Sequence, residues 1–305
     1  MTHAAPTPPS GFSAEWLQLR EPFDAAARAA AVAQPEMADG LARLRTARGT
    51  SPLQVLDLAC GLGANLRELA PRLGGAQHWH LLDHDAALLA ALPAALARWS
   101  ARQGYAFFAS DTDERACRIV GADFSASVSW ACVDLARHAA SLPFAAGALI
   151  TASALLDLVS AAWLQPLVQR ARDGGAAMYW ALSVDGRAQW TPADRDDAAV
   201  HTLFDAHQRR DKGFGPALGP QAPSAALGLL AAAGYRCRTA RADWHIDDAA
   251  AAPMRQAMID GSAAAAREQD PAAAARIEAW QARRSAGVAR SRLQVGHLDI
   301  LALPA

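Results

Sequence analysis

Residues 53–65 read LQVLDLACGLGAN, and this stretch decides the fold. Its first part, LQVLDLA (53–59), is a short apolar run that contains an acid near its end, which predicts a buried strand. The glycine turn CGLGAN (60–65) follows. LRELAPRL (66–73) then has its apolar residues at helical spacing. The segment therefore predicts a strand, a tight turn and a helix in direct succession.

Similar apolar runs recur along the chain and are separated by segments of helical spacing. They are HWHLLD (78–83), SVSWACVD (127–134), ALITAS (148–153) and AAMYWALSV (176–184). Strands that alternate with helices pair in parallel, so we expect a doubly wound α/β sheet. The alternation stops near residue 185. Two later strands are predicted at 235–244 and 294–303, with an Ala- and charge-rich helical segment between them.

We interpret the chain as an N-terminal helical extension, residues 1–48, followed by one main domain, residues 49–305. Insertions are expected at about 185–222 and 247–290. Breaks in the extension are expected near Pro22 and Pro35. Pro93 is expected to kink or split the helix over 86–99, because proline lacks an N–H and collides with the preceding turn.

The composition limits the possible partners and compartment. With 52% hydrophobic and 19% charged residues, the chain can bury a large core. A net charge of −1 argues against nucleic acid as a partner. The longest apolar stretch, 142–159, is interrupted by Pro143 and Asp157, so no membrane span is expected. No secretory signal is visible, and the four cysteines form no CxxC pair. We therefore predict buried thiols, no metal site and a cytoplasmic protein.

The glycine turn indicates the kind of cofactor. Glycines allow a ligand to approach the backbone closely, and a helix N-terminus offers free N–H groups. A dinucleotide fingerprint needs a third glycine where this chain has Leu66. Asp57 would repel a pyrophosphate but attract an amino group. A ligand with an amino-acid end and an adenosine end therefore fits better than a dinucleotide.

The stretch VLDLACGLGAN (55–65) resembles the first motif of the class I S-adenosylmethionine (SAM) methyltransferases, which usually have a glycine where this chain has Ala59. The resemblance is strong over 53–85 and weak beyond 185. It implies a Rossmann-like, seven-stranded, mostly parallel sheet with helices on both faces and an antiparallel last strand. It also implies SAM as the cofactor.

The resemblance assigns the cofactor to residues at the ends of the first four strands. In such enzymes the glycine turn lies against the methionine part, the acid of the second strand holds the ribose, and the acid of the third contacts the adenine amine. The residues at these places are Asp57, Ala59, Gly61, Gly63, Asn65, Asp83, His84, Asp134 and Thr151. Asn65 either caps the helix or faces the ligand. Asp85 is expected to be only a helix N-cap.

The segment after the fourth strand, TASALLD (151–157), is expected beside the transferred methyl group. It lacks the [ND]-P-P-[YF] motif that methyltransferases of adenine, cytosine or glutamine amides share, which argues against those acceptors. Ser153 and Asp157 are candidates for catalytic contact with the substrate. The plainer alternatives are a small residue chosen for space at Ser153 and a helix cap at Asp157.

The insertion VHTLFDAHQRRDKGFGPALGP (200–220) combines charged residues with glycines and prolines, which is typical of a lid. We predict His207 as a general base. Arg209, Arg210, Lys212 and Phe214 are predicted to bind an anionic acceptor. The alternative is a solvated helix face with weak surface ion pairs.

These observations predict a SAM-dependent methyltransferase that acts on an oxygen or nitrogen of a small, anionic organic molecule. The helices before residue 48, with Trp16 and REPFD (20–24), are expected to close over the cofactor. Two alternatives stay open. One is a protein or RNA methyltransferase, and the other is a non-catalytic SAM-binding module.

Overall fold

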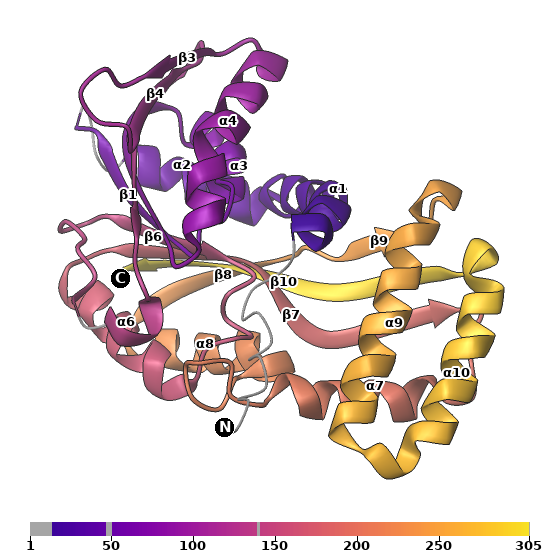
Figure 1. Ribbon diagram of the computed structural model, residues 1–305. Coiled ribbons are helices and arrows are strands. Elements are labelled where there is room, and N and C mark those ends of the chain that lie inside the picture. The colour runs from indigo at the N-terminus through magenta and orange to yellow at the C-terminus, as the bar shows by residue number, and fades with distance from the viewer. Residues whose placement is uncertain (1–13, 47–50, 139–140, 305) are drawn as a thin grey trace, which may run out of the picture.

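The computed structural model describes residues 14–46, 51–138 and 141–304. One ten-stranded sheet has the spatial order β3-β4-β5-β2-β1-β6-β7-β10-β8, and β9 pairs with β10 (Figure 1). The strands are β1 (Leu53–Leu58), β2 (Gly75–Asp83), β3 (Ala106–Ala109), β4 (Ala116–Val120), β5 (Phe124–Cys132), β6 (Leu149–Ser153), β7 (Ala177–Thr191), β8 (Tyr235–Arg241), β9 (Trp244–Ile246) and β10 (Arg292–Pro304). The helices are α1 (Ala14–Val32), α2 (Pro35–Thr46), α3 (Ala64–Leu73), α4 (Ala86–Gln103), α5 (Leu135–His138), α6 (Ala161–Asp173), α7 (Asp197–Gln208), α8 (Ala222–Ala232), α9 (Ala252–Gln269) and α10 (Ala274–Gly287).

The centre of the sheet is parallel. β5, β2, β1, β6 and β7 run in the same direction, as connections through helices require. At one side β10 runs antiparallel between β7 and β8. The seven strands predicted from the sequence are therefore present, and the antiparallel last strand is confirmed.

The prediction from apolar runs in the sequence missed three short strands. β3 and β4 form an antiparallel extension beyond β5, and β9 pairs with β10 where one longer strand over 235–244 was predicted. β3 contains no buried residue, and β4 alternates between buried and more exposed positions. Such segments bury too little apolar surface to produce a continuous hydrophobic run.

Two predicted helix breaks are wrong. Pro22 lies inside α1 and Pro93 lies inside α4, and both helices continue past the proline. Each proline removes one backbone hydrogen bond, and packing on the sheet retains the rest of the helix. For Pro22 the carbonyl that loses its partner belongs to Gln18, an exposed residue that water can reach. Pro35 begins α2, a position that suits proline.

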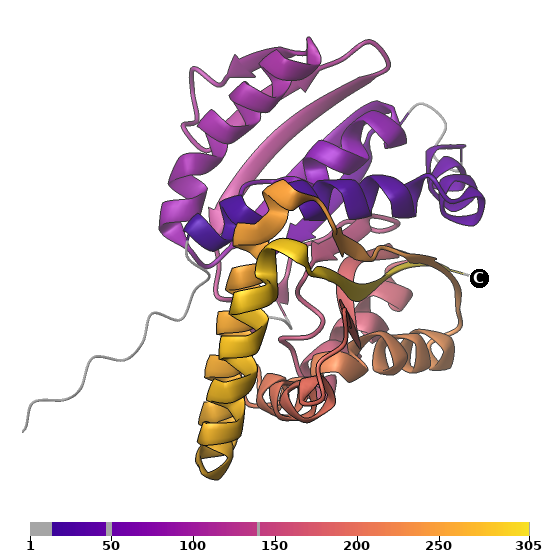
Figure 2. The same cartoon turned by 90° about the vertical axis from the view of Figure 1, so that its right-hand side faces the viewer.

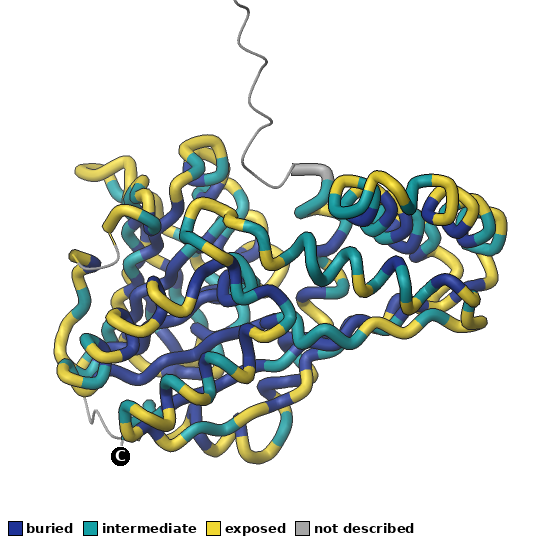
Figure 3. The backbone as a smooth tube through the Cα atoms, turned by 90° about the horizontal axis from the view of Figure 1, so that it is seen from below, coloured by how far each residue is buried: buried dark blue, intermediate teal, exposed yellow. Residues whose placement is uncertain are grey.

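Helices cover both faces of the sheet, and the core is buried between them (Figure 3). One apolar cluster joins α1–α4 to the sheet through residues such as Trp79, Leu66 and Leu92. A second cluster joins α6 and α8 to the opposite face through residues such as Leu164 and Trp180. The carboxyl ends of the parallel strands thus lie between two helical layers.

The two predicted insertions pack against each other in a helical lobe (Figures 1 and 2). β7 continues past Ala181, the last residue that pairs with β6, and pairs with β10 as a long arm. α7, α9 and α10 enclose a small core that includes Trp280. At the start of α7, three aspartates form ion pairs with arginines of α10; the pairs are Asp194–Arg283, Asp196–Arg276, Asp196–Arg283 and Asp197–Arg284.

All four cysteines are free thiols, as predicted, but not all are buried. Cys60 and Cys117 are buried, whereas Cys132 is exposed, because it is the last residue of β5 and lies at the rim of the sheet. Within the described residues, no helix has the length and apolar character needed to cross a membrane.

A substitution in the arm formed by β7 and β10 can test how closely the two strands are packed. Gly296 lies where the register between β10 and β7 shifts, and a Cβ added there would come within 2.7 Å of the Arg187 Cβ. We expect Gly296→Ala to lower the free energy of unfolding by about 1–3 kcal/mol, because a backbone-anchored atom must move. Urea denaturation measures the change.

Gly261→Ala is the matched control. A Cβ at this exposed position of α9 meets nothing within 4 Å, so helix propensity should make the variant equally or slightly more stable. Equal stability of the two variants would show that the register shift can absorb a side chain.

Candidate functional site

The carboxyl ends of β1, β6 and β7 carry a row of buried polar side chains. Asp57 is in register with Thr151, and Thr151 is in register with Tyr179. All three residues are buried, and partners in register share one face of the sheet. The row faces α1 and α3, because Val55 and Leu149, two residues earlier on their strands, belong to the core on that side.

The glycine turn follows β1 and opens α3. Ala59, Gly61 and Gly63 all have left-handed backbone, with φ of 52°, 53° and 73°. This conformation costs a residue with a side chain about 1 kcal/mol, so Ala59 is strained at the position where the methyltransferase motif usually has glycine. A Cβ at Gly61 would meet nothing within 4 Å. The space in front of this backbone is therefore open to a ligand.

Asp83, at the end of β2, holds the glycine turn in place. The Gly61 N–H donates to its Oδ2 at 2.8 Å, and the Asp85 N–H donates to its Oδ1 at 2.9 Å. His84 follows, with a largely exposed ring whose Nδ1 is 3.5 Å from Asp83 Oδ1. Two carboxylate oxygens offer about four acceptor positions, so Asp83 retains capacity for further donors such as hydroxyl groups.

Asp134 lies beside Asp83 on the neighbouring strand end. The Val133 N–H donates to the Asp83 carbonyl at 2.8 Å, which fixes this spacing. The Asp134 side chain is half exposed and accepts the Ala136 N–H, so its role at an adenine stays a prediction. Asp85 is the N-cap of α4, as predicted.

Asn65 joins α3 to the polar row. Its Nδ2 donates to Asp57 Oδ1 at 3.3 Å and to Thr151 Oγ1 at 3.0 Å. It therefore does not cap α3, whose N-cap is Gly63. Asp57 Oδ2 and Asn65 Oδ1 are buried without a hydrogen-bond partner. A ligand with several N–H donors, such as an ammonium group, would satisfy both acceptors.

Helix α1 places three buried charged side chains over these strand ends. Arg20, Asp24 and Arg28 are all buried, and Arg20 Nε donates to Asp24 Oδ2 at 2.8 Å. Asp24 also accepts the indole N–H of Trp244. Arg28 Nη2 donates to Ser153 Oγ at 2.7 Å, while its Nε is buried without a partner.

Arg28 is a site candidate that sequence reasoning missed. The signal was present, because Arg20, Asp24 and Arg28 recur at four-residue spacing in an otherwise Ala-rich helix. The charge of Arg28 also acts on Asp57. Burial raises the pKa of the Asp57 carboxyl to about 7, and the Asn65 hydrogen bond and Arg28 oppose that rise.

The loop after β6 contains the two predicted acceptor residues. The chain leaves the strand through Ala154, whose φ is 51°, and the Ala154 N–H donates to the Ala181 carbonyl. Ser153 accepts from Arg28, so its hydroxyl group is used. Asp157 is not the cap of α6, because Ser160 fills that place. Asp157 Oδ1 is buried without a partner.

The predicted lid segment lies against this loop. The Gly219 N–H donates to the Asp157 carbonyl at 3.0 Å, and the Leu218 N–H donates to the Val159 carbonyl at 2.8 Å. Phe214 packs edge-on against Trp163 of α6, with ring centroids 5.4 Å apart. The fold therefore brings the segment around Lys212 to the loop that carries Ser153 and Asp157.

The charged end of α7 lies against α9. His207 Nε2 is 3.1 Å from Glu268 Oε2, and Arg210 Nη1 donates to Glu268 Oε1 at 2.7 Å. Arg209 is the C-cap residue of α7 and lies next to Gly219. These contacts join the lid segment to the lobe. The proposed roles of His207, Arg209 and Arg210 at an acceptor stay predictions.

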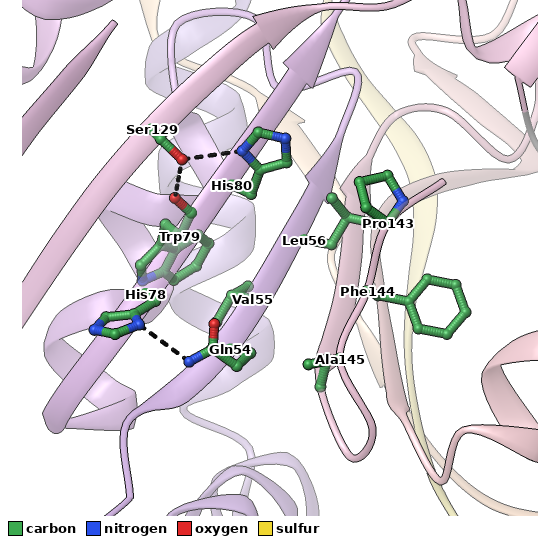
Figure 4. A pocket seen from close by; sticks show the side chains of 11 residues that line it. Gln54, Val55, Leu56, His78, Trp79, His80, Ser129, Pro143, Phe144 and Ala145 are labelled. Carbon is green, nitrogen blue, oxygen red and sulfur yellow. Dashed lines mark hydrogen bonds between the residues drawn. The ribbon is translucent and has the colours of Figure 1, made fainter. Parts of the chain in front are cut away.

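A separate cavity of about 200 Å³ lies along the middle of β1 and β2, away from the polar row (Figure 4). His78 and His80 line it from β2, and His80 Nδ1 is 3.0 Å from Ser129 Oγ. Pro143 and Phe144 form the opposite wall. Of the polar side chains that line it, His78 is exposed, and Gln54 and His80 are partly exposed. Among the described residues, no group of three or more His, Cys, Asp or Glu could hold a metal ion.

No protein-family model matches the chain, and no curated protein matches it. Among solved structures it is similar to a cyclopropane-fatty-acyl-phospholipid synthase-like protein from Lactobacillus casei, with 14% identity, a TM-score of 0.46, and 95% of this chain and 94% of that chain covered. It is also similar to the YcgJ protein from Bacillus subtilis, with 11% identity, a TM-score of 0.43, and 88% and 99% covered. A third is phosphoethanolamine N-methyltransferase 2 from Haemonchus contortus, in complex with phosphomonomethylethanolamine and S-adenosylhomocysteine, with 13% identity, a TM-score of 0.36, and 88% and 53% covered.

The topology of the chain itself defines the fold. A parallel centre in the order β5-β2-β1-β6-β7, an antiparallel β10 between β7 and β8, and a glycine turn after β1 together make a Rossmann-like methyltransferase fold.

The raised pKa of Asp57 has a consequence for stability. Between the unfolded value of 3.8 and the folded value of about 7, the native state holds a proton that the unfolded state has lost, so stability falls as pH rises through this range. We expect Asp57→Asn to raise the free energy of unfolding of the ligand-free protein by about 2–4 kcal/mol at pH 8. At pH 4 the gain should nearly vanish.

Urea denaturation at both pH values measures this difference. Asp173→Asn, at an exposed carboxylate that accepts from Gln169, is the control and should change little at either pH. A destabilised Asp57→Asn variant at pH 8 would show that the buried carboxylate is compensated in the native protein.

Proposed function

We propose that the protein is a SAM-dependent methyltransferase that acts on an oxygen or nitrogen of a small organic molecule. The observation that carries the proposal is the set of unsatisfied polar atoms beside the open glycine turn. Asp57 Oδ2 and Asn65 Oδ1 lack donors, and Arg28 Nε lacks an acceptor. An α-amino-acid end supplies an ammonium group for the first two and a carboxylate for the third.

The rest of the ligand fits the next strand end. Asp83 is anchored by two backbone N–H groups and can accept from the two hydroxyls of a ribose. The open space in front of Gly61 leaves room for the part that joins sugar and amino acid. When bound, SAM supplies a methyl group on a positively charged sulfur. The chain's part is to orient the reactants and exclude water.

The elements that lie over the site support the proposal that the methyl acceptor is a small molecule. α1 lies across the strand ends through Arg28–Ser153 and Asp24–Trp244 contacts, and the lid segment closes the loop of Asp157 from the other side. The charges of Arg20 and Lys212 both lower the pKa of Asp157, which supports cationic surroundings for the acceptor proposed beside it. A short anionic molecule suits such a site better than a polymer.

Variants should separate the two ends of the cofactor. We expect Arg28→Gln to weaken binding of S-adenosylhomocysteine (SAH) about 10- to 100-fold, because a carboxylate loses a charged donor. Binding of 5′-methylthioadenosine, which lacks the amino-acid end, should stay unchanged. Asp83→Asn should weaken both ligands.

Isothermal titration calorimetry measures these affinities, with Asp85→Asn as the control, because asparagine also serves as an N-cap. If wild-type protein binds neither nucleoside, the proposed function is wrong. If Arg28→Gln weakens both ligands equally, Arg28 does not hold the amino-acid end.

The affinity for SAH should depend on pH. Only the ionised Asp57 carboxylate attracts an ammonium group strongly, and its pKa is about 7. We therefore expect affinity to rise about tenfold from pH 6 to pH 8. Asp57→Asn should give weaker binding with a flat profile, and 5′-methylthioadenosine should bind wild-type protein equally at both pH values. Affinity that falls over this range would contradict the assignment of Asp57.

A further inference from the structure

The loop after β6 presents Asp157 between the two layers that cover the sheet. Its main chain is held by Gly219 of the lid segment. The charges of Arg20 on α1 and Lys212 in the lid segment both lower the pKa of the Asp157 carboxyl, against the larger effect of burial. The loop reaches this place through the left-handed Ala154, a strained conformation of the kind that concentrates at functional sites.

Among the described residues, no hydrogen-bond donor contacts Asp157 Oδ1. Ser160, not Asp157, caps α6, so the carboxylate has no helix to terminate. The oxygen is buried without a hydrogen-bond partner. A buried acceptor without a donor costs free energy, and an external N–H or O–H group would remove that cost. Ser153, four residues earlier, differs in that its hydroxyl oxygen accepts a hydrogen bond from Arg28.

We propose that Asp157 Oδ1 accepts the proton of the methyl acceptor, so that the acceptor is an amine or a hydroxyl compound and not a carboxylate. This inference rests on the proposed function and specifies its substrate class. A carboxylate acceptor is already a nucleophile and has no proton to give. An anionic oxygen would also be repelled by Asp157 itself.

In the proposed methyl transfer, one bond forms and one bond breaks at the methyl carbon. The lone pair of the acceptor nitrogen or oxygen forms a bond to the methyl carbon, and the bond between that carbon and sulfur breaks. Its electron pair stays on sulfur, which becomes neutral in SAH. The acceptor's proton passes to Asp157 Oδ1. Burial raises the pKa of the Asp157 carboxyl, which makes its carboxylate a better base, while a backbone hydrogen bond and the charges of Arg20 and Lys212 oppose that rise.

Two other titratable groups interact with Arg20: Asp24, which accepts its guanidinium hydrogen bonds, and His297, on which its charge acts. Burial, together with the charge of Arg20, lowers the pKa of His297 to about 4, and its Nδ1 lies 3.1 Å from the Val295 carbonyl. A base that weak accepts a proton poorly near neutral pH. His207 is engaged with Glu268 on α9. Asp157 is therefore the better-placed base at the carboxyl end of β6.

The test uses SAM with an isotopically labelled methyl group and a small-molecule extract of the cells that contain the protein. Products are separated, and the labelled fraction is treated with mild alkali. Methyl esters release labelled methanol, whereas methylated amines and ethers retain the label. We expect the label to be retained. We also expect Asp157→Asn to slow transfer about 10²- to 10⁴-fold, with SAH affinity within about twofold of wild type.

Asp157→Glu should recover part of the rate, and Asp173→Asn is the matched control with full rate. Unchanged SAH affinity also shows that the Asn variant is folded. Release of labelled methanol overturns the proposal, as does an Asp157→Asn variant with wild-type rate. A wild-type protein that binds SAH but labels no component also overturns it. Failure of wild type to bind SAH instead overturns the proposed function itself.

Discussion

The site depends on one carboxylate that the fold buries without fully compensating it. Asp57 is fully covered by α1 and α3, yet one of its oxygens has no donor. A buried carboxylate that lacks donors normally lowers the stability of the folded state or takes up a proton. The protein retains it by surrounding it with Asn65, Thr151 and the more distant Arg28. Under the proposed function, an external ammonium group would supply the donors that Asp57 and Asn65 lack among the described residues.

The topology explains how such distant residues meet. Asp57 and Asp83 follow strands joined by α3, whereas Thr151 and Ser153 come from a strand almost a hundred residues later. Parallel pairing places all of these strand ends at one edge of the sheet, where ligands of open α/β folds bind. α1 then crosses this edge and adds Arg28. The residues proposed to bind the cofactor and the acceptor are thus distant in sequence but lie at one edge of the sheet.

Local sequence was sufficient for the central strands and the glycine turn. The apolar runs before Asp57 and Asp83 are short but clear, and the acid in each of them marks the carboxyl end of a strand. Local sequence was insufficient to predict β3 and β4, because their more exposed residues do not form a continuous apolar run. It also failed for Pro22 and Pro93, because tertiary packing outweighs the loss of one helical hydrogen bond.

In the site, too, local sequence predicted some residues, whereas other contacts were evident only in the structure. Asp83 was assigned from its place at a strand end, but its grip on the Gly61 N–H needed coordinates. Arg28 was missed because only the crossing of α1 over β6 reveals what it touches. The pairing of His207 with Glu268 joins residues 61 positions apart in sequence, and no local pattern encodes such a contact.

The lid segment has one end in the helical lobe and the other on the loop of Asp157. The lid segment therefore connects α9 to the loop after β6, whereas Asp57 and Asp83 lie on β1 and β2, which make no such contact with the lobe in these bonds. If the proposed roles are correct, a change in α9 would alter the surroundings of the acceptor and leave the strand ends that bind the cofactor as they are.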